Sequence, residues 1–252
     1  MNQDKEVQQL KKRLLELART ADNKGICTYS DFLTMRDISD FYSLKSELPL
    51  INYDLFGGYE SAERKVLCFY GDESVKAFSS YVTCVCILPL NKKFSDDLSH
   101  RDFLGAILNL GIDCSKIGDI MVKEKVGYVF CENVISSFIC DNLVKVKHTN
   151  VRCEICEEAP DIKPDFQEIK GTVASSRLDA VIALACHSSR SNVLGLIAGG
   201  KVYVDGRLIE SNSFLLKENQ TVSVRGYGKF IYNGLQNQNK KGRYYVTLLK
   251  YI

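Results

Sequence analysis

Four cations stand beside apolar runs in one short stretch of the chain. Arg177 and Arg190 each come just before an apolar segment, and Lys201 and Arg207 flank the segment VYVDG. Cations at the start of a helix strengthen an anion site, because the free amides and the dipole there already favour negative charge. The set fits the phosphates of a folded RNA, whereas any one of these residues alone is as well explained as a solvated surface cation.

Two short helices and a hairpin are predicted to position these cations. Leu178, Val181, Ile182 and Ala185 are spaced as one buried face of a helix. Ser176 precedes them and is a residue type that caps helix N-termini. We therefore expect the first helix to begin directly after Ser176.

A second helix is predicted to begin at Ser189, as its cap, and to end at Gly199-Gly200. Its inward-facing residues are expected to be Val193, Leu194 and Ile197. Asp205-Gly206 then predicts a two-residue hairpin turn. The polar segment 233–243 is expected to be a loop between two strands.

The other candidate RNA contacts are small polar or cationic side chains. In the C-terminal part they are Ser189, Ser191, Arg225 and Lys229, and in the rest of the chain they are Arg64, Lys65, His100 and Arg101. His100 and Arg101 follow Ser99, a predicted helix cap, and so stand where a phosphate would meet free amides. We identify no catalytic residue, metal ligand or cofactor site.

Net charge is distributed unevenly along the 252 residues. Residues 171–252 contain 11 Lys and Arg against 4 Asp and Glu, a balance of +7, and the remainder contains 22 against 27, a balance of −5. A basic part joined to an acidic part is expected of a nucleic-acid-binding protein. Basic surfaces also bind acidic proteins and membranes, so the charge alone does not decide.

Composition and cysteine usage indicate a cytoplasmic protein. No apolar run of about 18 residues predicts a membrane span, and the N-terminal sequence lacks the apolar segment of a secretion signal. Most of the ten cysteines lie in apolar runs, where they are expected to be buried free thiols. These are Cys68, Cys84, Cys86, Cys131, Cys140 and Cys186.

The chain is predicted to have an α+β fold in four regions. They are 1–78, mostly helical with a strand near 66–70; 79–160, ferredoxin-like; 161–171, a connector; and 172–252, the basic domain of two helices and a small sheet. The second region follows the order strand, helix, strand, strand, helix, strand, which RNA-recognition modules also use. Tyr128 and Phe130 share a face of one of these strands, where they either stack bases or, as we favour, pack in the core.

Two further patterns favour ordinary structure over chemistry. His148, Cys153 and Cys156 resemble part of a zinc site, but a second pair of ligands is lacking, and residues three apart on a strand point to opposite faces. Gly57-Gly58 lacks the spacing of a phosphate-binding loop and predicts a tight turn.

The basic domain resembles the alpha-L RNA-binding motif first seen in ribosomal protein S-four. The resemblance rests on Arg177-Leu178-Asp179, Ser189-Arg190-Ser191, Ile197, Gly200 and VYVDG at 202–206. It implies that Arg177, Arg190 and Lys201 face RNA. Asp205 and Asn219-Gln220 depart from the residues common in that motif, which affects only details of the hairpin.

The rest of the chain is similar to the YlmH family of bacterial ribosome-associated proteins. The similar stretches are GGYESAERK (57–65), LSHRDFLGAILNLGI (98–112), IGDIMV (117–122) and RGYGKF (225–230), with Asp113-Cys114 replacing an expected basic residue. The resemblance implies a monomer that binds the large ribosomal subunit carrying obstructed peptidyl-tRNA, in ribosome rescue and quality control. A link to cell division is a further implication.

The sequence therefore predicts a non-enzymatic RNA-binding protein with no membrane association and no cofactor. One alternative is an RNA-modifying enzyme, although a pseudouridine synthase needs a catalytic aspartate in a large separate domain, and the body of this chain is too short for one. The other alternative is a protein–protein adaptor that uses the acidic part, which would show no salt-sensitive affinity for RNA.

Overall fold

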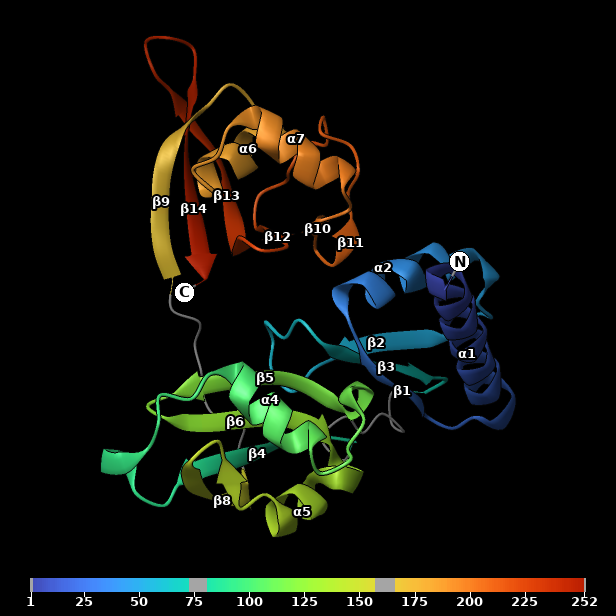
Figure 1. Ribbon diagram of the computed structural model, residues 1–252. Coiled ribbons are helices and arrows are strands. Elements are labelled where there is room, and N and C mark those ends of the chain that lie inside the picture. The colour runs from blue at the N-terminus through green and yellow to red at the C-terminus, as the bar shows by residue number, and fades with distance from the viewer. Residues whose placement is uncertain (1, 73–80, 157–165, 252) are drawn as a thin grey trace. The chain divides into compact units, whose positions relative to one another are not determined.

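The computed structural model describes residues 2–72, 81–156 and 166–251 and divides into two compact units, Met1–Asp161 and Ile162–Ile252 (Figure 1). The fold is α+β in both units, as predicted. The predicted N-terminal and middle regions therefore lie together in the first unit.

The N-terminal half of the first unit is a three-stranded antiparallel sheet with two helices. Its elements are α1 (Asn2–Lys24), β1 (Thr28–Leu33), α2 (Met35–Ser43), the 3₁₀ helix η1 (Lys45–Glu47), β2 (Asn52–Phe56) and β3 (Lys65–Tyr70). The strand order is β1-β3-β2. The predicted strand near 66–70 is confirmed, but β1 and β2 correct the expectation of a mostly helical segment.

Buried polar residues explain why β1 does not stand out in the sequence. Ser30 is 2% exposed, and its hydroxyl accepts a hydrogen bond from the amide of Leu67 at 2.9 Å. The β1–β3 register shifts between Tyr29 and Phe32, so the strand contains an irregularity around Ser30. A half-buried strand is recognised in a sequence by apolar residues at alternate positions. In β1 one of the buried positions holds Ser30 instead, so the alternating pattern is interrupted.

The second half of the first unit has the predicted ferredoxin-like topology. Its elements are β4 (Val82–Pro89), η3 (Lys92–Phe94), α4 (His100–Leu108), η4 (Cys114–Lys116), β5 (Ile117–Lys123), β6 (Val126–Glu132), α5 (Asn133–Asn142), β7 (Lys145–Val146) and β8 (Thr149–Ile155). The antiparallel order is β5-β6-β4-β8-β7, so β6 lies between β4 and β5, which α4 connects. Ser99 caps α4 in a capping box with Asp102, as its position predicted.

The two faces of this sheet pack against different partners. On one face Val85, Ile87 and Val129 pack with the apolar residues of α4 and α5. On the other face Phe130 packs with Phe32 and Val66 from the N-terminal sheet. The two sheets of the first unit therefore meet face to face, with helices on their outer sides.

The second unit is a six-stranded antiparallel sheet with two helices. Its elements are β9 (Phe166–Val173), α6 (Leu178–Ala185), α7 (Arg190–Ala198), β10 (Val202–Val204), β11 (Arg207–Leu208), β12 (Gln220–Val224), β13 (Gly228–Gln238) and β14 (Tyr244–Tyr251). The order is β11-β10-β12-β13-β14-β9. The predicted buried face of α6 is confirmed, and so is the hairpin turn at Asp205-Gly206. The core of this unit joins both helices to the strands.

Four local predictions for the second unit are wrong. The connector predicted over 161–171 contributes most of β9, which pairs with β14 along its whole length; residues 161–165 lie outside the described ranges. The cap of α6 is Arg177 rather than Ser176, because the carbonyl of Ser176 accepts from Leu216 in a strand-like contact. In α7, Leu194 is 39% exposed, and Leu196 packs against the core instead.

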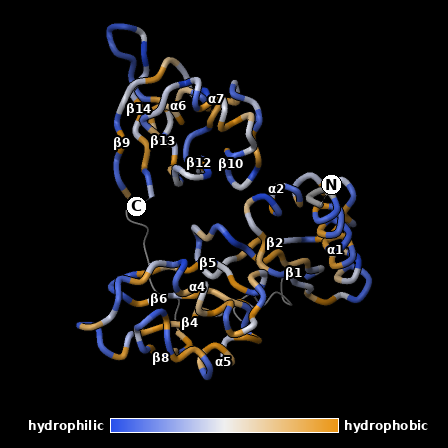
Figure 2. The backbone as a smooth tube through the Cα atoms, viewed as in Figure 1, coloured by the Kyte–Doolittle hydropathy of each residue, from blue (hydrophilic) through white to orange (hydrophobic). Residues whose placement is uncertain are grey.

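The fourth correction concerns the polar segment 233–243. Most of it belongs to β13, and only residues 239–243 form the turn to β14. The β13–β14 register shifts twice beyond Tyr232, and this end of the hairpin is hydrophilic (Figure 2). Because its side chains from Leu235 to Gln238 face solvent, the strand carries no apolar alternation that the sequence could show.

The cysteines are mostly free thiols, as predicted, with one exception. Cys68, Cys84 and Cys131 are buried and free, and burial raises the pKa of each thiol to about 12. Cys86, which was expected to be free, forms a disulfide with Cys156. Cys86 lies on β4, and Cys156 directly follows the paired strand β8, where its amide donates to the carbonyl of Cys84 at 2.9 Å. Their Cα atoms are 6.0 Å apart, a separation that suits a disulfide.

Candidate nucleic-acid interface

The N-terminus of α6 carries a side-chain ion pair. Nε and Nη2 of Arg177 donate to the two carboxylate oxygens of Asp179 at 3.1 and 3.2 Å. Asp179 is 4% exposed, and its Oδ1 also accepts from the amide of Ala180 at 2.9 Å. The carboxylate of Asp179 therefore occupies the anion site at the N-terminus of α6. This corrects the prediction that the free amides there, together with Arg177, are open to a phosphate of RNA.

Asp179 stays ionised because cations surround it. Burial alone would raise the pKa of Asp179, but the hydrogen bonds and charge of Arg177, the amide of Ala180 and the charge of Arg190 together hold it below its ordinary value. The same hydrogen bonds and charge raise the pKa of Arg177. The carboxylate thus fixes the plane of the Arg177 guanidinium, while the side chain remains 43% exposed.

Arg190 occupies the first turn of α7 and is exposed. Within the described ranges its side chain forms no ion pair, so its charge is available to a ligand. Ser189 caps the helix by accepting from the amide of Asn192 at 3.3 Å, as predicted. The hydroxyls of Ser189 and Ser191 lie 2.9 Å apart, which places two exposed polar groups beside Arg190.

Lys201 and Arg225 are neighbours at one end of the β10–β12 pair. The amide of Arg225 donates to the carbonyl of Lys201 at 2.9 Å, directly beyond the paired residues Val202 and Val224. Both side chains are exposed, as is that of Arg207 in β11. The structure therefore brings together two cations that are 24 positions apart in the sequence.

Lys229 lies in the same sheet but contacts an aromatic ring. Its Nζ stands 4.6 Å from the ring centroid of Tyr251, a cation–π contact. Lys229 pairs across the strands with Ser223 in β12. It is half-buried, so it offers less of its charge to a ligand than Lys201 or Arg225.

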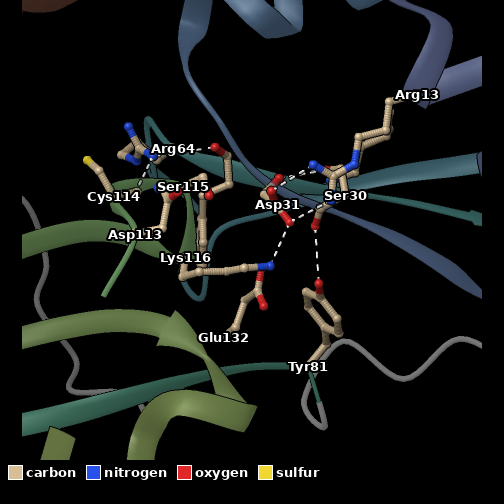
Figure 3. Close-up of polar contacts among 12 residues, drawn as sticks. Arg13, Ser30, Asp31, Arg64, Tyr81, Asp113, Cys114, Ser115, Lys116 and Glu132 are labelled. Carbon is tan, nitrogen blue, oxygen red and sulfur yellow. Dashed lines mark hydrogen bonds and ion pairs between the residues drawn. The ribbon is translucent and has the colours of Figure 1, made fainter. Parts of the chain in front are cut away.

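Arg64 is held inside the first unit. Its guanidinium donates to the carbonyls of Ile117 at 2.8 Å and Cys114 at 3.0 Å (Figure 3). A guanidinium that donates to backbone carbonyls positions the chain, so Arg64 has a structural role that the sequence did not indicate. Lys65, at the start of β3, is half-buried.

Two of the stretches that resemble the YlmH family meet in one joint between the halves of the first unit. Asp119, in IGDIMV, accepts from the hydroxyl of Tyr59 at 2.7 Å and from the amides of Glu63 and Arg64 at 2.7 and 3.1 Å. Tyr59, Glu63 and Arg64 all belong to GGYESAERK. Gly58 has φ +98° and lies against the ring of Phe130. The turn itself lies at Tyr59–Ala62, where the amide of Ala62 donates to the carbonyl of Tyr59 at 3.4 Å, so the predicted tight turn at Gly57-Gly58 is wrong in position.

A second cluster of charges lies at the same joint (Figure 3). Nζ of Lys116 contacts Oδ1 of Asp31 at 2.8 Å and Glu132 at 3.1 Å. The guanidinium of Arg13 donates to Oδ2 and Oδ1 of Asp31 at 3.0 and 3.1 Å. Burial raises the pKa of Glu132, whereas for Asp31 the contacts with Lys116 and Arg13 outweigh burial and lower the pKa. These residues connect α1 and β1 to the middle sheet.

His100 and Arg101 are exposed in the first turn of α4, as predicted. The amides of that turn already have an anion, because Asp102 accepts from the amide and hydroxyl of Ser99, both at 2.8 Å. Lys147 pairs with Asp102 at 2.9 Å. This helix tip is therefore a weaker phosphate site than the sequence indicated.

Two remaining alternatives concern Phe130 and the cysteines near the end of β8. Phe130 is 1% exposed and lies in the core, which excludes it as a base-stacking residue and confirms the packing that we favoured. Cys153 and Cys156 pack on opposite faces of the sheet, and Cys156 is joined to Cys86. In the part of the chain that the structure describes, no group of three or more His, Cys, Asp or Glu could hold a metal ion.

Over the described ranges, no single helix is long and apolar enough to cross a membrane. The helices α6 and α7 together reach the length and composition of a span but are bent by 114° at the break between them. Their buried residues form the core of the second unit.

The fold and the cations of the second unit define an RNA-binding class of protein. Residues 176–222 match the S4 domain, and residues 78–159 match the family described as "Putative RNA-binding domain in YlmH". These matches confirm the resemblance to the YlmH family that was predicted from the sequence.

A relative that spans most of the chain agrees with these matches. The chain is 25% identical to the ribosome-associated protein quality control protein P2 of Bacillus subtilis, over 92% of this chain and 91% of that protein. A solved structure of the cell division protein ylmH from Streptococcus pneumoniae is 21% identical and covers 60% of this chain and 91% of its own, with a TM-score of 0.49.

Proposed function

We propose that this protein is a non-enzymatic ribosome-associated factor that binds ribosomal RNA on the large subunit, contacts peptidyl-tRNA and acts in ribosome rescue or translation quality control. It acts as a monomer in the cytoplasm. The observation that carries the proposal is the arrangement at α6 and α7, where Asp179 fixes Arg177 beside the exposed Arg190. The similarity to a ribosome-associated quality control protein supports the ribosome as the place of binding.

Recognition is mainly of the RNA backbone and its shape. The cations of the second unit are held by rigid helix tips and strand ends, and its balance of +7 over residues 171–252 favours phosphates. Arg177 keeps Nη1 for a ligand while Nε and Nη2 hold Asp179. Such fixed donors position a folded RNA without reading its bases.

Co-sedimentation with purified ribosomal subunits from the same cells tests this function. We expect the protein to sediment with large subunits, with an affinity that falls as salt is raised. Mass spectrometry of ribosomal RNA after incubation with the protein and common cofactors tests the non-enzymatic part. A new modified nucleotide would contradict it, and co-sedimentation with neither subunit would contradict the ribosomal part.

A further inference from the structure

Both faces of the sheet of the ferredoxin-like domain are already covered. Its sheet packs on one side against α4 and α5 and on the other against the N-terminal sheet, so Phe130 cannot meet a base. The edge that carries Asp119 and Lys116 is joined to the N-terminal half. RNA that reaches this domain must therefore contact another part of it.

Three loops gather at the other end of the sheet, and we call them the loop end. They are residues 90–99 after β4, which include η3; residues 123–125 at the turn from β5 to β6; and residues 143–149, which run from the end of α5 through β7 to the first residue of β8. The topology places all three at the end where β4 and β5 finish, away from Lys116 at the start of β5 and Glu132 at the end of β6.

Hydrogen bonds hold these loops in fixed positions. Nζ of Lys125 donates to the carbonyls of Ser95 at 3.0 Å and Lys92 at 3.5 Å, which ties the β5–β6 turn to the first loop. Asp96 accepts from the amide of His148, and its own amide donates to the hydroxyl of Thr149 at 2.9 Å. The loop end is therefore one connected surface built from three distant segments.

This surface is basic and carries one prominent aromatic ring. The three loops contain six lysines against three acids. Of these acids, Asp96 is engaged within the loops and Asp97 lies 3.7 Å from Lys125. Over the described residues, four of the lysines form no ion pair and are exposed, namely Lys92, Lys93, Lys123 and Lys145.

Phe94 follows Lys92 and Lys93 directly in η3. It is 78% exposed, and Nζ of Lys93 stands 5.7 Å from its ring centroid. Its 3₁₀ helix is capped by Asn91, whose side chain accepts from the amide of Lys93. An exposed aromatic ring on an ordered turn loses little entropy when a base stacks on it.

We propose that the loop end is a second RNA-binding site, where Phe94 stacks on a base of single-stranded RNA and the lysines around it contact the adjacent phosphates. Stacking on an aromatic ring beside a basic groove is how proteins hold single strands without reading their sequence. The site rests on the proposed RNA-binding function and adds to it a contact that lies outside the S4 domain.

Photo-crosslinking with a short oligouridine that contains 4-thiouridine tests this site in the full-length protein. After ultraviolet irradiation, mass spectrometry maps the crosslinked peptides. We expect crosslinks in the peptide that contains Phe94, as well as in the second unit. Phe94→Ala should abolish the loop-end crosslink and weaken binding of the oligouridine about tenfold. Lys92→Glu with Lys93→Glu should reduce the salt dependence by about 0.7 log units per lost contact.

Matched control variants show whether the loss of RNA binding is specific to the loop end or follows from the loss of any exposed ring or charge. Phe138→Ala removes another half-exposed ring of the same domain, and Lys5→Glu with Lys12→Glu reverses two exposed charges on α1; neither should change binding. Crosslinks confined to the second unit, or unchanged RNA affinity of Phe94→Ala, would overturn the second site and leave the proposed function standing. Absence of salt-sensitive crosslinking anywhere in the chain would defeat both.

Discussion

Asp179 holds Arg177 through both carboxylate oxygens, at 3.1 and 3.2 Å, across a single turn of chain at the start of α6. The carboxylate is buried and the guanidinium is partly exposed. An acid inside an RNA-binding surface reduces its charge, but here it also fixes the direction in which an arginine points. Removal of this carboxylate should therefore strengthen RNA binding if net charge decides the affinity, and weaken it if the orientation of Arg177 decides.

Asp179→Asn should weaken RNA binding even though it removes a negative charge. The amide cannot hold both nitrogens of Arg177 as a carboxylate does, so the guanidinium loses its fixed orientation. The second unit should also lose about 1.5–3 kcal/mol of unfolding free energy, as expected for hydrogen bonds to a charged group. RNA affinity and chemical denaturation measure the two effects.

Glu210→Gln is the matched control, since it removes one exposed negative charge from the same unit. It should strengthen RNA binding slightly and leave stability unchanged. Tighter binding by Asp179→Asn than by the native protein would show that charge outweighs orientation.

The capping box of α4 predicts a pH-dependent contribution to stability. Hydrogen bonds from Ser99, together with Lys147, lower the pKa of Asp102 from 3.8 to about 2. Because the folded-state pKa is depressed, the contribution is present above about pH 4 and is lost as the pH falls towards 2. Carboxyl titration by NMR should give the depressed pKa, and Asp102→Asn should remove this part of the acid dependence. A pKa near 3.8 would contradict the cap.

Gly58 should tolerate no side chain. Its φ is +98°, and a Cβ there would overlap the Phe130 ring. Gly58→Ala should therefore cost roughly 2–5 kcal/mol of unfolding free energy, from backbone strain and overpacking. Gly25→Ala is the control, since Gly25 has φ +62° but no atom within 4 Å of a Cβ, and it should cost about 1–2 kcal/mol. Equal losses in thermal denaturation would contradict the close contact with Phe130.

Lys116→Met should destabilise the joint between the two halves of the first unit. The substitution leaves Glu132, which is 3% exposed, without its cation. It should lower the free energy of unfolding by roughly 3 kcal/mol. The pKa of Glu132 should rise further, so the loss should be largest at neutral pH and smaller where Glu132 is protonated. Lys12→Met, on the surface of α1, should change denaturation little at any pH. A loss that did not vary with pH would contradict the role of Glu132.

The sequence predicted best those elements whose limits are marked by local residues. Ser99 marks the start of α4, and Ser189 and Gly199-Gly200 bound α7, because caps and terminating glycines act within one turn. It failed at β1, where the buried Ser30 replaces an apolar residue, and at β9, which is a strand only because β14 pairs with it. Pairing between distant segments leaves no local pattern.

The same limit applies to the functional residues. The basic character of the second unit and the exposure of Arg190 and Lys201 follow from the sequence, whereas the pairing of Arg177 needed the structure. The close spacing of Arg177 and Asp179 at a predicted helix start was the available signal. The disulfide between Cys86 and Cys156, 70 positions apart, had none.

The most direct test of the account is the salt dependence of binding to large ribosomal subunits by the variant Arg177→Glu, Arg190→Glu and Lys201→Glu. None of the three side chains lies in the core of the second unit, but Arg177→Glu leaves the buried Asp179 without its cation, so circular dichroism must show that the variant is folded before its binding is compared. Affinity should fall and the slope against salt should flatten by about one log unit for each phosphate contact removed. Binding by the folded triple variant with the affinity and salt slope of the native protein would contradict the account.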